Sequence, residues 1–170
     1  MKGWRGCQRA HQDFQYLDFA LEVKTTRAVT PETISISNVR QLDDEHIKEL
    51  YLSVVNVEQS PSSGCSLQQQ VTKIKNALSG TSLELFEEGL REVGFIEGHT
   101  EAYERELYSI KSIVHYSVKD GFPRMLIDQV PVGIKGIKYQ IKIDSCQSYQ
   151  VESPLVLDQV KKIEERIENE

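Results

Sequence analysis

The segment from residue 11 to residue 26, HQDFQYLDFALEVKTT, constrains the fold of this chain more than any other. In its second half, apolar and polar side chains alternate, so that Phe19 and Leu21 would lie on one face of a strand and Glu22 and Lys24 on the other. A period of two residues is typical of a strand with one buried face. The segment therefore predicts a strand that carries a carboxylate and an ammonium group on the same face.

A two-residue turn at Leu17 and Asp18 would fold this segment into a β-hairpin that places Asp13 opposite Glu22. The other pairs in this register are Tyr16 with Phe19, Gln15 with Ala20, and Phe14 with Leu21. Directly opposed residues have Cβ atoms about 4.5–5.5 Å apart, so the two carboxylates repel each other unless a cation lies between them. The hairpin therefore predicts a divalent-metal site, with Lys24 further along the same face.

Asp18 is too far from Glu22 to share one ion with it, because four residues of a strand span roughly 13 Å. We expect Asp18 to be a turn residue. Leu17 and Asp18 lack the Asn-Gly or Asp-Gly sequence of a tight hairpin turn, so a longer, bulged connection with a shifted register is the alternative.

The composition restricts the class of protein. A length of 170 residues fits one domain, and the chain contains no apolar run long enough to span a membrane and no signal peptide. Its three widely spaced cysteines suggest neither a disulfide framework nor a zinc site, which favours a cytoplasmic location. The net charge of −6 argues against a protein that coats nucleic acid through bulk charge, although residues 1–30 are mildly basic.

The remaining pattern predicts a mixed α/β (α+β) chain. We expect strands at residues 33–37, 50–58, 108–118 and 134–143, where β-branched or alternating residues dominate. Helices are predicted from residue 67 to Gly80, from a capping box at Thr81 and Glu84 to Gly94, and from Ser153 onwards. Residues 1–80 would form a core carrying the acidic motif, and residues 81–170 would extend it or pack on it.

Several short motifs carry a resemblance to a known family. They are Trp4-x-Gly6, Gln12-Asp13-Phe14, Glu22-Val23-Lys24-Thr25-Thr26, Gln41-Leu42-Asp43, Tyr116-Ser-Val118, Gly121-Phe-Pro-Arg124 and residues 139–143. Together they resemble the PD-(D/E)XK nuclease superfamily, and within it a bacterial group of family members often encoded among restriction and phage-defence genes. The resemblance extends over residues 4–149. It implies a restriction-endonuclease-like core, a mixed central sheet flanked by helices.

The resemblance implies a role for each residue of the hairpin motif. Asp13 and Glu22, with the backbone carbonyl of Val23, would bind Mg²⁺, for which Mn²⁺ can substitute. The ion would polarise a DNA phosphate and lower the pKa of an attacking water. Lys24 would orient that water or stabilise the developing charge, which makes Asp13, Glu22 and Lys24 the expected catalytic residues. The alternative is an ordinary Glu–Lys pair on a solvated strand face.

Five more residues are candidates for accessory roles, each with a plainer interpretation beside it. Gln41 would either lie near the metal or be an ordinary loop residue. Thr25 would either contact the DNA backbone or be present only because threonine favours a strand. His11 would either contact a phosphate or have no role. Lys138 and Lys142 share a strand face that would follow a phosphate backbone or be only solvated. His46, His99 and His115 show no metal-ligand spacing and are expected at the surface or in packing.

Two functions follow from the resemblance. The first is a Mg²⁺-dependent DNA endonuclease of a restriction or phage-defence system. The second is a non-catalytic DNA-binding or assembly subunit with the same fold, working beside other subunits or as a homo-oligomer. The superfamily core begins with a helix before the first acidic strand, and only twelve residues precede Asp13. We therefore expect this chain to lack the leading helix. It would be the C-terminal part of a longer protein or a chain whose start was removed, and it would be inactive alone if the missing part is needed.

Overall fold

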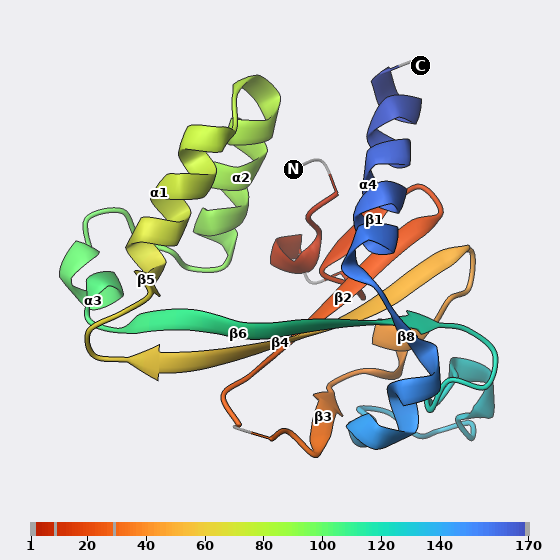
Figure 1. The fold of residues 1–170 in the computed structure, drawn as a ribbon. Coiled ribbons are helices and arrows are strands. Elements are labelled where there is room, and N and C mark those ends of the chain that lie inside the picture. Colours follow the sequence, from red (N-terminus) through yellow and green to blue (C-terminus); the bar gives the residue numbers. More distant parts are fainter. Residues whose placement is uncertain (1–2, 9, 29, 169–170) are drawn as a thin grey trace.

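The computed structural model describes residues 3–8, 10–28 and 30–168. The strands are β1 (Phe14–Tyr16), β2 (Phe19–Thr26), β3 (Thr33–Ile36), β4 (Glu49–Ser60), β5 (Cys65–Ser66), β6 (Leu107–Val118), β7 (Tyr139–Lys142) and β8 (Gln150–Val151). The helices are α1 (Leu67–Ala77), α2 (Gly80–Glu92), α3 (Thr100–Glu104) and α4 (Ser153–Glu168), with short 3-10 helices at Gly6–Gln8, Val39–Leu42, Ile127–Gln129 and Ile143–Tyr149. Along these residues a group of strands comes first, the helices α1 to α3 lie between β5 and β6, and α4 comes last (Figure 1).

The main sheet is mixed and curled. Its strands follow the order β1-β2-β4-β6-β5, and β8 also pairs with β6. The pairing of β2 with β4 is parallel, whereas the other pairings in this sheet are antiparallel. With helices flanking it, this mixed α+β arrangement is consistent with the restriction-endonuclease-like core implied by the resemblance. β2, which carries the acidic motif, lies between β1 and β4 inside the sheet.

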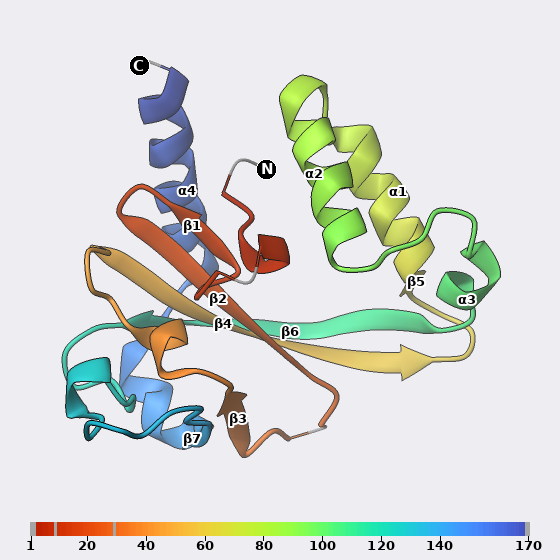
Figure 2. The ribbon, with the colours of Figure 1, turned by 180° about the vertical axis from the view of Figure 1, so that it is seen from behind.

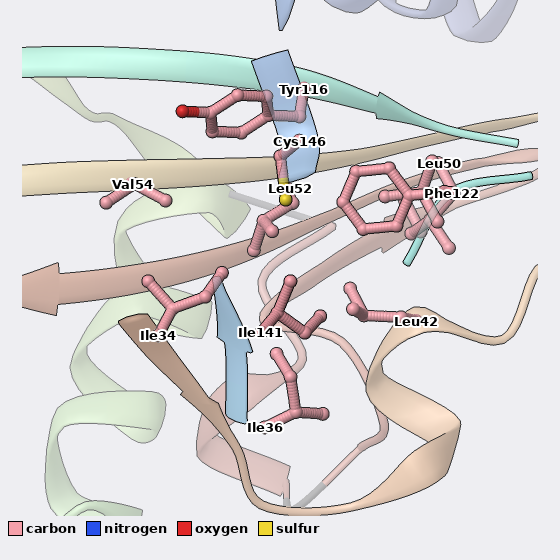
Figure 3. Close-up of a cluster of buried hydrophobic side chains, with 12 residues drawn as sticks. Ile34, Ile36, Leu42, Leu50, Leu52, Val54, Tyr116, Phe122, Ile141 and Cys146 are labelled. Atoms are coloured by element: carbon pink, nitrogen blue, oxygen red, sulfur yellow. The ribbon is translucent and has the colours of Figure 1, made fainter. Parts of the chain in front are cut away.

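A second, two-stranded sheet covers one face of the main sheet. It consists of β3 and β7, and we call it the β3–β7 ribbon (Figure 2). Its inward side chains Ile34, Ile36 and Ile141 meet Leu42 and Leu52 in a fully buried cluster (Figure 3). Burying an aliphatic side chain of this size contributes about 1.5–3 kcal/mol. This core therefore fixes the ribbon against the face of β2 that bears Glu22 and Lys24.

The opposite face of the main sheet carries the α-helices (Figure 1). Helix α4 packs there, with Val156 and Ile163 buried against Phe19 and Tyr51. The helices α1 and α2 form a separate cluster that includes Trp4, whose ring centroid lies 5.6 Å from that of Phe86.

The contact between the N-terminal segment and α2 depends on Gly89. A Cβ atom at this position would lie only 2.5 Å from the ring of Trp4. Because real Cβ contacts are never this short, the glycine is required for Trp4 to pack on the helix. The N-terminal segment that precedes the acidic hairpin is thereby anchored to α2.

Most of the predicted elements are present. The strands expected at residues 33–37, 50–58 and 108–118 correspond to β3, β4 and β6, and the helix expected from Ser153 is α4. The three cysteines are free, as expected. Within the part of the chain that the structure describes, no helix combines the length and apolar composition needed to cross a bilayer.

The predicted boundary between the first two helices is wrong. Helix α1 ends at Ala77, and Gly80 is the first residue of α2, so it does not terminate α1. With a φ of +51°, Gly80 turns the chain into α2 and places Thr81 inside the first turn. The capping box forms instead at the start of α1, where Ser66 accepts a hydrogen bond from the Gln69 amide.

The strand predicted at residues 134–143 is only half present. Just Tyr139–Lys142 pairs with β3, and the preceding residues form a loop. Gly133 and Gly136 have φ values of +94° and +69°, which a strand does not accommodate. The alternation of apolar residues and lysines therefore extends further than the strand itself.

Candidate active site

The β1–β2 hairpin has the two-residue turn and the register that the sequence predicts. Phe14 pairs with Leu21 and Tyr16 with Phe19, so the bulged alternative is wrong. Leu17 adopts a left-handed conformation with a φ of +51°. The turn is therefore tight although it lacks glycine.

Asp18 stabilises this turn through tertiary contacts. Its backbone carbonyl accepts hydrogen bonds from the amides of Lys48 and Glu49, at 2.8 and 3.0 Å. Its carboxylate pairs with Lys48 at 2.9 Å and with Arg166 at 3.3 Å. The hydrogen bond from Lys48 is the largest effect that lowers the pKa of Asp18. Asp18 is thus a turn residue, as predicted, and is not part of the acidic site.

Asp13 lies directly before β1 and is held from two sides. Its Oδ2 atom accepts a hydrogen bond from the backbone amide of Val23 at 2.8 Å. Its carbonyl oxygen accepts hydrogen bonds from the amides of Arg5 and Gly6 at 2.8 and 2.9 Å. A Cβ atom on Gly6 would approach Oδ1 of Asp13 to 2.8 Å. The N-terminal Trp4-x-Gly6 motif therefore makes room for the Asp13 carboxylate.

Glu22 is the buried member of the acidic pair, with only 1% of its surface exposed. Desolvation is the main reason that its pKa is raised to about 7, and the negative charge of Asp13 raises it further. Lys24 opposes this effect, because its Nζ atom lies 2.9 Å from Oε1 of Glu22. A cation near the two carboxylates would favour the ionised form of Glu22.

Gln41 reaches the same cluster from the 3-10 helix Val39–Leu42. Its Oε1 atom accepts two hydrogen bonds of 2.9 Å, one from Nζ of Lys24 and one from the amide of Ser37. Lys24 is consequently held between Glu22 and Gln41. The structure therefore places Asp13, Glu22, Lys24 and Gln41 together, as the sequence-based hypothesis requires.

The 3-10 helix that presents Gln41 is fixed by two buried side chains that the sequence analysis missed as site residues. Gln12, which is 3% exposed, donates a hydrogen bond to the carbonyl of Arg40 at 2.8 Å. Arg124 donates to the carbonyl of Leu42 at 2.6 Å and pairs with Asp44 at 2.8 Å. Both residues belong to motifs that carry the family resemblance. The structure explains these motifs as supports of the helix that presents Gln41.

Val23 is joined to this cluster through its backbone, and the remaining candidates are not. Thr25 is exposed on the face of β2 opposite to Lys24. Val23 contributes its backbone amide, which donates a hydrogen bond to the Asp13 carboxylate. His11 is exposed, and no hydrogen bond or ion pair joins it to another described residue. Lys138 and Lys142 are also exposed, before and within β7 respectively.

A second polar pair lies on the other face of the main sheet. The hydroxyl oxygen of Ser53 lies 2.6 Å from Nδ1 of His115 on the neighbouring strand. Burial lowers the pKa of His115, so the imidazole is neutral at physiological pH. No sequence pattern identifies this pair, because the two residues are far apart in the chain and meet only through the pairing of β4 with β6. Since Ser53 is 3% exposed, we interpret the pair as packing.

The donor atoms of the cluster suit a hard divalent cation. Asp13 and Glu22 supply carboxylate oxygens, and Mg²⁺ is commonly bound through one or two carboxylates together with water and substrate phosphate. Among the described residues, no group of three or more His, Cys, Asp or Glu side chains is placed to hold a metal. This excludes a site built entirely from such side chains in that part of the chain, whereas a two-carboxylate site completed by the substrate remains compatible with the geometry. The raised pKa of Glu22 also fits a site that a cation completes.

Most of the chain is similar to one family of known proteins. Residues 1–144 match a family model described as "Putative PD-(D/E)XK family member, (DUF4420)". The matched residues include Asp13, Glu22, Lys24, Gln41 and Arg124. The PD-(D/E)XK superfamily is of the nuclease kind and usually uses divalent metals. No curated protein and no solved structure matches the chain.

Proposed function

The chain belongs to the PD-(D/E)XK family whose model covers its residues 1–144, and on this premise we propose that it is a Mg²⁺-dependent DNA endonuclease. It would hydrolyse phosphodiester bonds in DNA as part of a restriction or phage-defence system. The observation that carries the proposal is the meeting of Asp13, Glu22 and Lys24 at one end of the β1–β2 hairpin. A solvated strand face would not bury its glutamate to 1% exposure.

The residues of the cluster would divide the chemistry between them. Asp13 and Glu22, with the Val23 carbonyl, would hold Mg²⁺ or Mn²⁺, which supplies charge stabilisation at the phosphate and a more acidic water. Lys24 would keep its ammonium group on the developing negative charge of the phosphate, since Gln41 and Glu22 restrict its position. The hydrogen bond from the Val23 amide would keep the Asp13 carboxylate turned towards Glu22.

A non-catalytic DNA-binding subunit with the same fold is the second candidate. One observation favours it: Nζ of Lys24 already lies 2.9 Å from Oε1 of Glu22, so the ammonium group compensates the ionised form of this carboxylate without any metal. In a catalytic site, binding of a cation would have to exchange this ion pair for metal coordination. The two candidates therefore differ in whether the ion pair opens when a divalent cation is supplied.

A plasmid-cleavage assay tests the proposal. We expect the protein to convert supercoiled DNA to nicked or linear DNA with Mg²⁺ or Mn²⁺, and not with EDTA. Asp13→Asn, Glu22→Gln and Lys24→Met should each lower the rate by roughly 100-fold or more, the usual effect of removing one group that stabilises transition-state charge. Lys161→Met, which removes an exposed charge on α4, is the matched control. A folded wild-type protein that leaves DNA intact, or variants that cut as fast as wild type, would contradict the proposal.

A further inference from the structure

The β3–β7 ribbon has one buried and one exposed face. Its buried face consists of Ile34, Ile36 and Ile141, which are at most 5% exposed. The opposite face is polar and fully accessible, and its side chains come in two cross-strand pairs. These pairs are Thr33 with Lys142 and Ser35 with Gln140. The core therefore holds the ribbon rigidly while its polar face remains open.

The charge of the ribbon differs from that of the rest of the chain. No acidic residue lies between Glu32 and Asp43, or between Asp128 and Asp144. These two stretches contain four basic residues, which are Arg40, Lys135, Lys138 and Lys142. The chain as a whole has a net charge of −6. The segments 33–42 and 129–143 are thus positively charged parts of an acidic protein, and positive charge complements a polyanion.

The ribbon is also continuous with the candidate active site. Ser37 directly follows β3, and its amide donates a hydrogen bond to Oε1 of Gln41 at 2.9 Å. The same oxygen accepts the hydrogen bond from Lys24. A single side chain therefore connects the end of the ribbon to the cluster that would act on phosphate. The end of the ribbon and the cluster are therefore adjacent.

We infer that the exposed face of the β3–β7 ribbon binds duplex DNA by lying in the major groove. The inference rests on the proposed function for the identity of the partner, and it adds the surface and the groove. The major groove of B-DNA accommodates a two-stranded β-ribbon, and ribbons of this kind are an established mode of reading it.

The side chains on the exposed face have the chemistry that base reading requires. An amide such as that of Gln140 can form paired hydrogen bonds with adenine. Lys142 can donate to guanine or to a phosphate, and the hydroxyl groups of Thr33 and Ser35 can bond to either partner. The ribbon therefore offers donors and acceptors that can tell base pairs apart, in addition to its positive charge.

Fluorescence anisotropy with a labelled duplex of mixed sequence, measured in EDTA, tests this surface without any cleavage. We compare wild type with Gln140→Ala and Lys142→Ala, and with Lys161→Ala as a control that removes an equal charge from α4 on the other face of the main sheet. All three positions are exposed, so the variants should fold, which circular dichroism verifies. A second duplex carries glucosylated hydroxymethylcytosine, whose sugar fills the major groove.

We expect each ribbon variant to bind about 5- to 100-fold more weakly than wild type, the range for losing one base or charged contact. Lys142→Ala should also reduce the salt dependence of binding by about one counterion. Lys161→Ala should bind like wild type, and the glucosylated duplex should bind weakly. Equal binding of wild type and the ribbon variants, undiminished binding of the glucosylated duplex, or no binding by wild type would each overturn the inference.

The experiment separates this inference from the proposed function. Weak binding by the ribbon variants, in a protein that never cleaves DNA, supports the ribbon and contradicts the nuclease. Metal-dependent cleavage by a protein whose ribbon variants bind DNA normally supports the nuclease and contradicts the ribbon.

Discussion

Replacing Glu22 with glutamine should change how the stability of the protein depends on pH. Glu22 is 1% exposed, and desolvation raises its pKa to about 7 from an ordinary value of 4.5. The folded protein therefore keeps the proton up to about pH 7, whereas the unfolded chain releases it near pH 4.5. Between these values the folded state holds more protons, so the free energy of unfolding falls as the pH rises.

The size of this effect follows from the shift in pKa. A shift of one pKa unit corresponds to about 1.4 kcal/mol, so the ionisation of Glu22 should cost about 3 kcal/mol across this range. Because the side chain is buried, solvent screens little of this free energy. The Glu22→Gln variant has no ionisable group at this position, so its free energy of unfolding should not fall by this amount as the pH rises. The stability of the variant relative to that of wild type should therefore rise by about 3 kcal/mol between about pH 4.5 and about pH 7.

Urea denaturation in EDTA at about pH 4.5 and about pH 8 measures this difference, on either side of the pKa of Glu22. Comparing wild type with variant cancels the contributions of the other titrating groups. Glu88→Gln, at an exposed position, is the control and should follow wild type. If Glu22→Gln shows the same pH dependence as wild type, Glu22 does not ionise in a desolvated site, and the reasoning is refuted.

Three further predictions concern the supports of the site. Gly6→Ala should displace the Asp13 carboxylate, because its Oδ1 atom would lie 2.8 Å from the new Cβ atom. A titration with Mn²⁺ should then show weaker binding, while an unchanged circular dichroism spectrum shows that the variant is folded. Arg124→Ala should lower the free energy of unfolding by about 2 kcal/mol, because it leaves the buried carbonyl of Leu42 and the carboxylate of Asp44 without their donor. Urea denaturation measures this loss, and Arg124→Lys as comparison shows whether one guanidinium group must contact both acceptors. Leu52→Ala should cost about 2–5 kcal/mol, since its side chain is completely buried, and a loss below 1 kcal/mol would contradict the packing described for this core.

The hairpin could be predicted from sequence because two local rules agree there. Strict alternation from Phe19 onwards assigns a face to every side chain, and a two-residue turn then fixes the register. What the sequence could not show is why the turn at Leu17 is tight. The carbonyl of Asp18 accepts hydrogen bonds from the amides of Lys48 and Glu49, and its carboxylate also pairs with Arg166 from a distant part of the chain. Tertiary contacts thus replace the glycine that the local rule demands.

Other local patterns misled the sequence analysis because a competing signal was stronger. The alternation before Tyr139 suggested a longer strand, but Gly133 and Gly136 turn the backbone out of the extended region. The capping pattern at Thr81 was overridden by Gly80, because α2 begins at Gly80 with Ser79 as its N-cap, two residues before the predicted cap. In both cases a glycine with positive φ set the element boundary.

The residues of the candidate site also fall into two groups, those that the sequence could predict and those that it could not. Asp13, Glu22 and Lys24 could be proposed from spacing and resemblance, because they belong to one hairpin. The supports Gln12 and Arg124 could not be assigned a role, since their partners are backbone carbonyls of a 3-10 helix that no pattern identifies. Such contacts become visible only when the fold brings distant segments together.

The proposed chemistry requires that Asp13 and Glu22 together bind a divalent cation. Calorimetric titration of Mn²⁺ and Mg²⁺ into wild type, Asp13→Ala and Glu22→Ala measures this binding. We predict binding by wild type that strengthens as the pH rises through about 7, where Glu22 ionises, and no binding by either variant. A folded wild-type protein that binds neither ion, or variants that bind as tightly as wild type, would contradict the account.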